Sequence, residues 1–276
     1  MLPEPVGRPA VAALELSLVA GTDRTVIVLG ASNVSRGLAR LVATVRARAA
    51  QPVDLFVAAG HGRAYAVNSR VWMRRLPSIL SSGLWAGLAG RAGGPRPVAL
   101  VTDIGNELLY GLGVAGVAGA VRESVRRLAD LGAAIAITGL PLESIARVGQ
   151  LRYRLMRAAY VPGCQLGLGD LVEAARWLDD EIRAVAAETG ADFLEQPGDW
   201  YGLDAIHLKR PRLDDLWSAA FDAWGWPRPA LPPRASLAEW AALASRAAEV
   251  RSLARVTLVT PQPAYRGPAS LRLWLY

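Results

Sequence analysis

Five short apolar runs recur along the first two thirds of the chain, and helical patterns separate them. The runs cover residues 25–29, 52–59, 97–104, 133–138 and 191–194. Each is rich in β-branched or other apolar residues, and its length is typical of a strand that is buried on both faces. The alternation of strand and helix predicts an α/β fold. We expect a central parallel sheet of about five strands, covered by helices on both faces and connected by right-handed crossovers.

Apolar residues spaced three and four positions apart predict the helices between these strands. After Asn33, for example, the apolar positions Val34, Leu38, Leu41 and Val45 alternate with arginines. We expect further helices at residues 114–131, 143–159 and 170–189 and after Pro211. Residues 66–88 mix helix and turn signals, and helical segments are expected there.

The pattern divides the chain into three parts. Residues 1–23 form an N-terminal lead-in, residues 24–226 the α/β domain, and residues 227–276 a C-terminal extension. Prolines break the chain after Trp226, and the following apolar spacing predicts one amphipathic helix. The final residues alternate apolar runs with prolines, so we expect a strand or an irregular segment packed on the core. The alternative is a dimer contact or a partner site.

Composition narrows the possible functions. The formal net charge is +7 with 31 basic residues, but nearly all of these are arginines scattered over helix faces. No recognisable nucleic-acid-binding module accompanies them, so nucleic acid is not an expected partner. Cys164 is the single cysteine, which argues against an intrachain disulfide or a multi-cysteine metal site. The apolar residues 9–20 include Glu15 and resemble neither a signal peptide nor a membrane span, so we expect a cytoplasmic location.

Ser32 stands where the first apolar run gives way to a helical pattern. The intervening sequence is Gly30-Ala31-Ser32-Asn33. The carboxyl end of a parallel strand is where α/β sheets bind ligands, and free N–H groups at a helix start favour developing negative charge. We therefore interpret Ser32 as a catalytic nucleophile. The alternative is that Ser32 or Asn33 only caps the helix.

A second informative stretch, Asp204-Ala205-Ile206-His207-Leu208, follows a loop rich in glycine and proline. A carboxylate three residues before a histidine can hydrogen-bond the imidazole and fix its tautomer, as a general base requires. The alternative is that Asp204 is a turn residue and His207 a surface or core residue. The other histidine of the chain, His61, has no carboxylate near it in the sequence.

Four strand ends or loops carry candidate groups, namely those at Ser32, Gly60 and Asn106 and the loop with Asp204 and His207. A parallel sheet would bring them to one edge. Ser32 supplies a hydroxyl, His207 a base and Asp204 an orienting carboxylate. The backbone N–H groups of Ser32 and Gly60 and the side-chain amide of Asn106 are suited to binding an oxyanion. Together these groups are what acyl transfer requires.

At these residues the chain resembles the SGNH (GDSL-like) hydrolase family, whose four blocks centre on a Ser, a Gly, an Asn and a D-x-x-H. The resemblance covers about residues 24–224. It implies a three-layer α/β/α flavodoxin-like sandwich that hydrolyses esters without a metal or an organic cofactor. It also implies that Ser32 is the nucleophile, that Gly60 and Asn106 complete the oxyanion hole, and that Asp204 and His207 complete the triad. The expected protein is a serine ester hydrolase that works through an acyl-enzyme intermediate on a small-molecule, lipid or carbohydrate ester.

Two blocks depart from the family pattern. Ala31 stands where the family usually has Asp, and Ile104-Gly105-Asn106-Glu107 stands where it usually has Gly-x-Asn-Asp. Neither change removes a group that the reaction needs. Both alter the hydrogen bonding expected around the nucleophile.

Two other function classes stay open. A nucleotide-binding dehydrogenase also has a glycine after its first strand, but Val34 and Arg36 occupy positions where its fingerprint needs glycine. With Lys209 as the only lysine, the chain also lacks the Tyr-x-x-x-Lys pair of that class. A noncatalytic binding protein on the same fold is the third possibility. For the substrate, Tyr65 and Tyr110 lie near the candidate loops and are expected to line an acyl or alcohol pocket, the alternative being a packing role.

Overall fold

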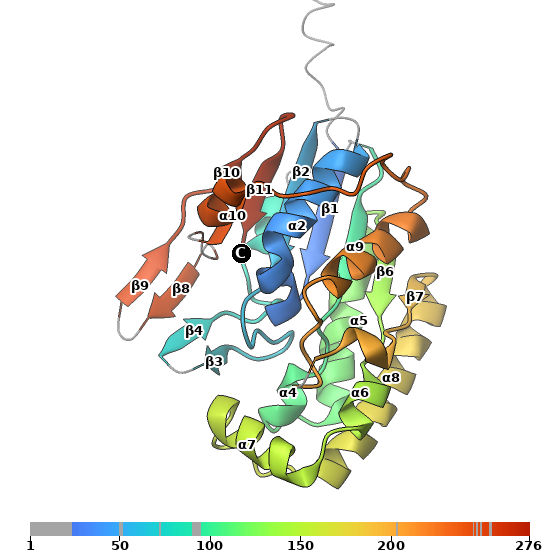
Figure 1. The fold of residues 1–276 in the computed structure, drawn as a ribbon, viewed down its shortest axis with the longest axis vertical. Helices are drawn as coiled ribbons and strands as arrows, with labels where there is room; N and C mark the ends of the chain where they lie inside the picture. The colour runs from blue at the N-terminus through green and yellow to red at the C-terminus, as the bar shows by residue number, and fades with distance from the viewer. Residues whose placement is uncertain are drawn as a thin grey trace, which may run out of the picture.

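A seven-stranded sheet forms the centre of the computed structural model (Figure 1). The structure describes residues 24–49, 52–71, 73–89, 95–202, 204–244, 246, 248, 250–253 and 256–276. The expected lead-in at 1–23 lies outside these residues. The strands lie in the order β10-β11-β2-β1-β5-β6-β7. Their bounds are β1 Arg24–Leu29, β2 Val53–Ala58, β5 Val98–Val101, β6 Ala134–Thr138, β7 Asp192–Leu194, β10 Tyr265–Arg266 and β11 Arg272–Leu275.

The five strands expected from the sequence are β1, β2, β5, β6 and β7, and all of them pair in parallel. Their order, β2-β1-β5-β6-β7, is the flavodoxin-like order in which the chain starts near the middle of the sheet and turns outward on both sides. Every residue of β2 and the last four of β1 are buried, as strands covered on both faces must be. The predicted fold class is therefore confirmed.

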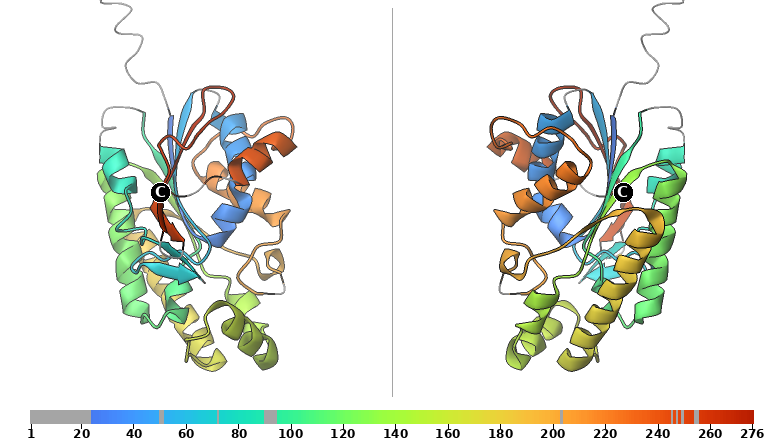
Figure 2. Two further views of the ribbon diagram at one scale, coloured as in Figure 1. Left: turned by 90° about the vertical axis from the view of Figure 1, so that its left-hand side faces the viewer. Right: turned by 90° about the vertical axis from the view of Figure 1, so that its right-hand side faces the viewer.

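Helices cover both faces of this sheet, as the edge-on views in Figure 2 show. One face packs against α2 (Ser32–Ala49), α9 (Arg212–Ala223) and α10 (Leu237–Ala244). The other packs against α3 (Leu84–Ala89), α5 (Val114–Asp130) and α8 (Leu168–Thr189). At Gly37 of α2, an added Cβ would lie 2.9 Å from Cζ2 of Trp217, so this glycine lets α9 approach closely. Two apolar layers thus hold the sheet.

The C-terminal segment supplies the two strands beyond the expected five. β11 pairs in parallel with β2, and β10 pairs antiparallel with β11. The ring of Trp274 stacks on that of Phe56 with centroids 4.7 Å apart. Arg272 forms an ion pair with the buried Asp54 of β2, with Nε 2.6 Å from Oδ1. Residues beyond 226 therefore extend the same sheet.

The helical expectation for residues 66–88 is wrong over most of that stretch. The strands β3 (Ser69–Val71) and β4 (Arg74–Leu76) form an antiparallel pair, and only α3 near the end is helical. β4 also pairs with β8 (Val250–Leu253), which pairs with β9 (Val256–Val259) to give a four-stranded sheet. Because β4 pairs with β8, which lies far away in the sequence, the hydrophobic pattern of residues 66–88 alone does not reveal this sheet. The mixed helix and turn signals of this stretch were therefore misleading.

Short helices at the carboxyl end of the main sheet complete the fold. They are α4 (Asn106–Leu109), α6 (Leu142–Ala146), α7 (Gln150–Tyr160) and the 3-10 turn η1 (Gly198–Trp200). The single helix expected at 143–159 is thus two, α6 and α7. Within the described part of the chain, no helix combines the length and apolar character that crossing a membrane requires.

Candidate active site

Ser32 is the first residue of α2 and follows the buried end of β1 by three positions. The backbone is held on both sides of this turn, since Gly30 N donates to Ala58 O at 3.0 Å and Thr102 N donates to Leu29 O at 2.9 Å. Ser32 as a residue is 8% exposed. The residues of the turn are therefore fixed by β2 and β5, while the hydroxyl sits at the rim of the sheet.

A carboxylate from another strand caps α2. Asp103, which follows β5, accepts hydrogen bonds at Oδ2 from the backbone N–H groups of Ala31 (2.8 Å), Asn33 (2.9 Å) and Val34 (3.3 Å). Among the described residues, neither the hydroxyl nor the backbone N–H of Ser32 has a hydrogen-bond partner. The capping interpretation of Ser32 therefore loses its support, because Asp103 performs that role.

Asp103 was missed in the sequence, although one signal pointed to it. It is a carboxylate just past a buried strand and two residues before the Gly105-Asn106 pair, at the edge where ligands bind. Its backbone has φ 57°, a left-handed conformation in which Asp is one of the few tolerated residues. Asp103 therefore supplies a carboxylate beside the Ser32 turn, where it accepts from the backbone N–H of Ala31.

Asn33 links the Ser32 turn to the Asp204/His207 loop. Its Nδ2 donates to Asp103 Oδ1 at 2.7 Å and to Ile206 O at 3.0 Å. Its Oδ1 accepts from Leu208 N at 2.9 Å. Asn33 is only 3% exposed, so these bonds form away from solvent. Asn33 thereby holds together two segments more than 170 residues apart in the sequence.

Asp204 and His207 form the expected pair. Asp204 Oδ2 lies 2.5 Å from Nδ1 of His207, and its Oδ1 accepts the backbone N–H of His207 at 2.9 Å. Burial alone raises the pKa of Asp204, but the hydrogen bonds and charge of His207, with Arg36 nearby, hold that pKa below its usual value. The carboxylate is thus charged at neutral pH and is hydrogen-bonded to Nδ1, which leaves Nε2 of the imidazole available for proton transfer.

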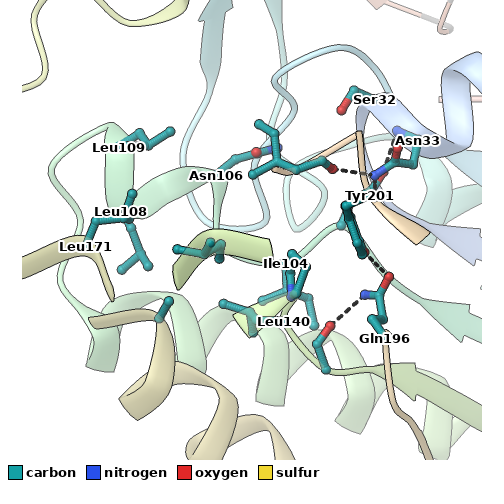
Figure 3. A pocket seen from close by; sticks show the side chains of 17 residues that line it. Ser32, Asn33, Ile104, Asn106, Leu108, Leu109, Leu140, Leu171, Gln196 and Tyr201 are labelled. Carbon is teal, nitrogen blue, oxygen red and sulfur yellow. Dashed lines mark hydrogen bonds between the residues drawn. The ribbon is translucent and has the colours of Figure 1, made fainter. Parts of the chain in front are cut away.

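One cavity of about 350 Å³ is lined by Ser32, Asn106 and His207 together. A smaller cavity of about 80 Å³, drawn in Figure 3, adjoins it along Ser32 and Asn106. In Figure 3 the polar side chains of Ser32 and Asn33 lie on one side, and Leu108, Leu109 and Leu171 gather on the other. Ser32, Asn106 and His207, which come from three separate segments, therefore meet at the larger cavity. The rest of its wall is largely apolar.

Asn106 begins α4, directly after Gly105, whose φ of 110° suits glycine. Its Nδ2 donates one hydrogen bond to Arg63 O at 2.9 Å, which fixes the amide and leaves its second hydrogen available. Gly60 is not among the residues that line the cavity beside Ser32. It starts a turn, since its carbonyl accepts from Arg63 N at 3.0 Å, and Gly62 of that turn lines the cavity instead.

His61 of the same turn also lines this cavity. Burial, followed by the positive charges of Arg74, His207 and Arg36, lowers the pKa of His61 below its ordinary value. His61 is therefore neutral at physiological pH. The two histidines share one cavity, but among the described residues only His207 is hydrogen-bonded to a carboxylate through its ring.

The two tyrosines expected in the substrate pocket differ in position. Tyr110 lines the cavity, and its hydroxyl donates to Gly62 O at 2.6 Å. Burial, with the charge of Glu107, raises the pKa of Tyr110 to about 12, so it stays protonated. Tyr65 is 1% exposed and donates to the carbonyls of Leu29 (3.2 Å) and Thr102 (2.7 Å). The expectation for Tyr65 is wrong, because it is a core residue that ties β1 to β5.

No three His, Cys, Asp or Glu side chains of the described ranges gather into a group that could hold a metal ion. What the residues beside the cavity offer is a hydroxyl, an imidazole paired with a carboxylate, and amide donors. These are groups for proton transfer and for nucleophilic attack on a carbonyl.

Comparison with known proteins finds similarity in solved structures only. No protein-family model and no curated protein matches the chain. Similar structures include the psychrotrophic esterase EstA from Pseudoalteromonas sp. inhibited by monoethylphosphonate, with 14% identity and a TM-score of 0.48 over 73% of this chain and 98% of that one. TesA has 17% identity and a TM-score of 0.44 over 72% and 97% of the two chains. The acetyl xylan esterase AlAXEase has 12% identity and a TM-score of 0.42 over 70% and 98%.

Proposed function

We propose that the protein is a serine ester hydrolase of the SGNH type, with Ser32, His207 and Asp204 as its catalytic triad. The observation that carries the proposal is the single cavity lined by Ser32 and His207, in which Asp204 occupies the other nitrogen of the imidazole. A free hydroxyl, a base and an orienting carboxylate are the three parts of an activated serine nucleophile.

The reaction proceeds in two halves. Nε2 of His207 takes the proton of Ser32 Oγ as that oxygen attacks the ester carbonyl, and Asp204 stabilises the resulting imidazolium. The tetrahedral intermediate expels the alcohol, which takes the proton from His207, and an acyl-Ser32 ester remains. Water then attacks that ester, again giving its proton to His207, and the carboxylic acid leaves as Ser32 regains its proton.

Developing negative charge on the carbonyl oxygen requires hydrogen-bond donors that are already in place. The N–H of Ser32 suits this role, because Asp103 accepts from its neighbours Ala31, Asn33 and Val34 and not from Ser32 itself. Asn106 offers its second amide hydrogen from a side chain fixed by Arg63 O. The sequence pointed to Gly60 as the third donor. Gly62 of the same turn lines the cavity instead, so we assign the third donor to a backbone N–H of this turn.

Replacement of the nucleophile tests the proposal. Ser32→Ala should lower kcat for p-nitrophenyl esters roughly a million-fold, the loss typical of removing a serine nucleophile. It should also prevent labelling by an organophosphonate, measured as a mass increase on the peptide that contains residue 32. Ser35→Ala is the matched control, because Ser35 lies one turn along the same helix and its hydroxyl donates to Ala31 O at 3.0 Å.

Retained turnover in a folded Ser32→Ala protein, or an adduct on another serine, would contradict the triad. A wild-type protein that hydrolyses no ester in a panel of graded acyl length, and takes up no phosphonate, would instead favour a noncatalytic binding protein on the same fold.

A further inference from the structure

The helix α7 is attached to the body of the protein by few side chains. Of its eleven residues only Tyr153 is buried, and Figure 1 shows the helix at the lower end of the molecule, beyond α4. Leu151 is 73% exposed and Leu155 is 65% exposed. These two leucines are four positions apart, so they lie on the same side of the helix, one turn above the other. The outer face of α7 is therefore apolar and unpartnered within the described structure.

The charges on α7 are of one sign. Its sequence, QLRYRLMRAAY, contains three arginines and no acidic residue. Arg152 and Arg154 are exposed beside the leucine pair, and Arg157 is held by Leu166 O at 3.0 Å. An exposed helix that combines apolar residues with arginines on its flanks is suited to the interface of an anionic lipid layer, where leucines enter the acyl region and arginines meet headgroups.

The inner face of α7 closes an apolar extension of the catalytic cavity. Tyr153, Met156 and Tyr160 line a cavity of about 70 Å³ together with Leu109 and Ile206. Leu109, Tyr160 and Ile206 also line the larger cavity that contains Ser32 and His207. One helix therefore has apolar residues on its outside and, on its inside, an apolar cavity that shares lining residues with the cavity beside Ser32.

We propose that α7 docks the protein on an anionic lipid surface, from which an ester with an apolar acyl group enters the cavity beside Ser32. The proposed docking is argued from α7 alone and does not depend on catalysis. The entry of the ester, in contrast, rests on the proposed hydrolase function. A second copy of the chain fits this face less well, because a twofold contact would bring the arginines of both helices together with no carboxylate on either helix to offset them.

Vesicle sedimentation tests the docking without reference to catalysis. The full-length protein is mixed at low salt with vesicles of phosphatidylcholine alone or of phosphatidylcholine with phosphatidylglycerol. We expect binding to the anionic vesicles only, weakening as salt is added, because screening shortens the reach of the arginines. Arg152→Gln with Arg154→Gln should lower the partition coefficient about thirtyfold, or about fivefold for each arginine. Leu151→Ser with Leu155→Ser should lower it at least about tenfold.

Leu231→Ser with Arg234→Gln is the matched control, since it makes the same chemical changes at exposed positions away from α7. The control and Ser32→Ala should bind vesicles as the wild type does. The α7 variants should keep the wild-type circular dichroism spectrum and their turnover of a water-soluble ester, which separates docking from folding and from catalysis. Equal binding by the α7 variants and the wild type would overturn the proposal. So would an absence of binding to anionic vesicles, or a leucine-pair variant that changes only the oligomeric state.

Discussion

At the scale of single residues, Glu107 is a buried carboxylate with an incomplete set of partners. Its Oε1 accepts hydrogen bonds from the backbone N–H groups of Tyr65 and Ala66. Its Oε2 is buried without a hydrogen-bond partner. Burial raises the pKa of Glu107, and the backbone amides of Glu107 itself, Tyr65 and Ala66 offset only part of that effect. The folded state therefore favours the protonated acid more than the unfolded state does.

This difference makes stability depend on pH. As pH rises from the ordinary glutamate value of 4.5 toward the raised folded value, the folded protein retains a proton that the unfolded chain has lost, so the free energy of unfolding falls. Glu107→Gln cannot ionise and should remove this part of the slope, so that the variant gains stability relative to wild type as pH rises above the ordinary glutamate value of 4.5. Urea midpoints measured across this range check it. Glu173→Gln, at an exposed position, should leave the slope unchanged, and parallel curves for wild type and Glu107→Gln would refute the argument.

At the scale of elements, the start of α2 depends on a strand that the helix does not follow in sequence. Three backbone N–H groups of α2 and its preceding turn converge on Asp103 Oδ2, and Asn33 Nδ2 binds Oδ1. Asp103→Asn keeps the shape but turns one acceptor into a donor. It also removes the negative charge at the positive end of the helix dipole.

We expect Asp103→Asn to lower the free energy of unfolding by about 1 to 3 kcal/mol, because buried donors lose their acceptor. It should also lower kcat for ester hydrolysis, since Asp103 and Asn33 together position the Ser32 turn against the His207 loop. Asp170→Asn is the matched control, because Asp170 is an acidic residue in the first turn of α8 and is exposed there. Its effect on stability should stay below about 0.5 kcal/mol. Equal effects of the two substitutions in urea unfolding would mean that the capping bonds contribute little.

The same elements show what the sequence could and could not predict. The sequence singled out Ser32, Asn106 and the Asp204/His207 pair as candidates, because each follows a strand end or loop whose local pattern is visible. Asp103 and Asn33 were not assigned their roles, because those roles arise only when β5, α2 and the His207 loop are packed together. The small sheet was not predicted for the same reason, since its two hairpins, β3–β4 and β8–β9, are joined only by the pairing of β4 with β8, which lie far apart in the sequence.

At the scale of the whole molecule, the position of the C-terminal segment links the two ends of the described chain. β11 pairs with β2, which pairs with β1. Only β2 therefore separates β1, the strand that leads to Ser32, from the edge formed by β10 and β11. A division of the chain at residue 226 stays a prediction, but residues on both sides of it share one sheet. The key polar contact across this pairing is Arg272 with Asp54, whose side chain is 1% exposed.

Removing one member of this pair should loosen the sheet from its edge. Arg272→Gln takes away the guanidinium that offsets the buried Asp54 carboxylate, and breaking such a pair costs about 3 kcal/mol or more. The loss should appear as a lower urea midpoint and as faster amide hydrogen exchange in Leu273, Trp274 and Leu275. Asp54→Asn combined with Arg272→Gln should recover much of the stability, because the buried carboxylate and the guanidinium that offsets it are then removed together. Arg266→Gln, at an exposed position on the neighbouring β10, should change neither measurement. If β11 exchanged at the wild-type rate in Arg272→Gln, its attachment would rest on the stacking of Trp274 on Phe56 and on the backbone ladder with β2 rather than on the ion pair.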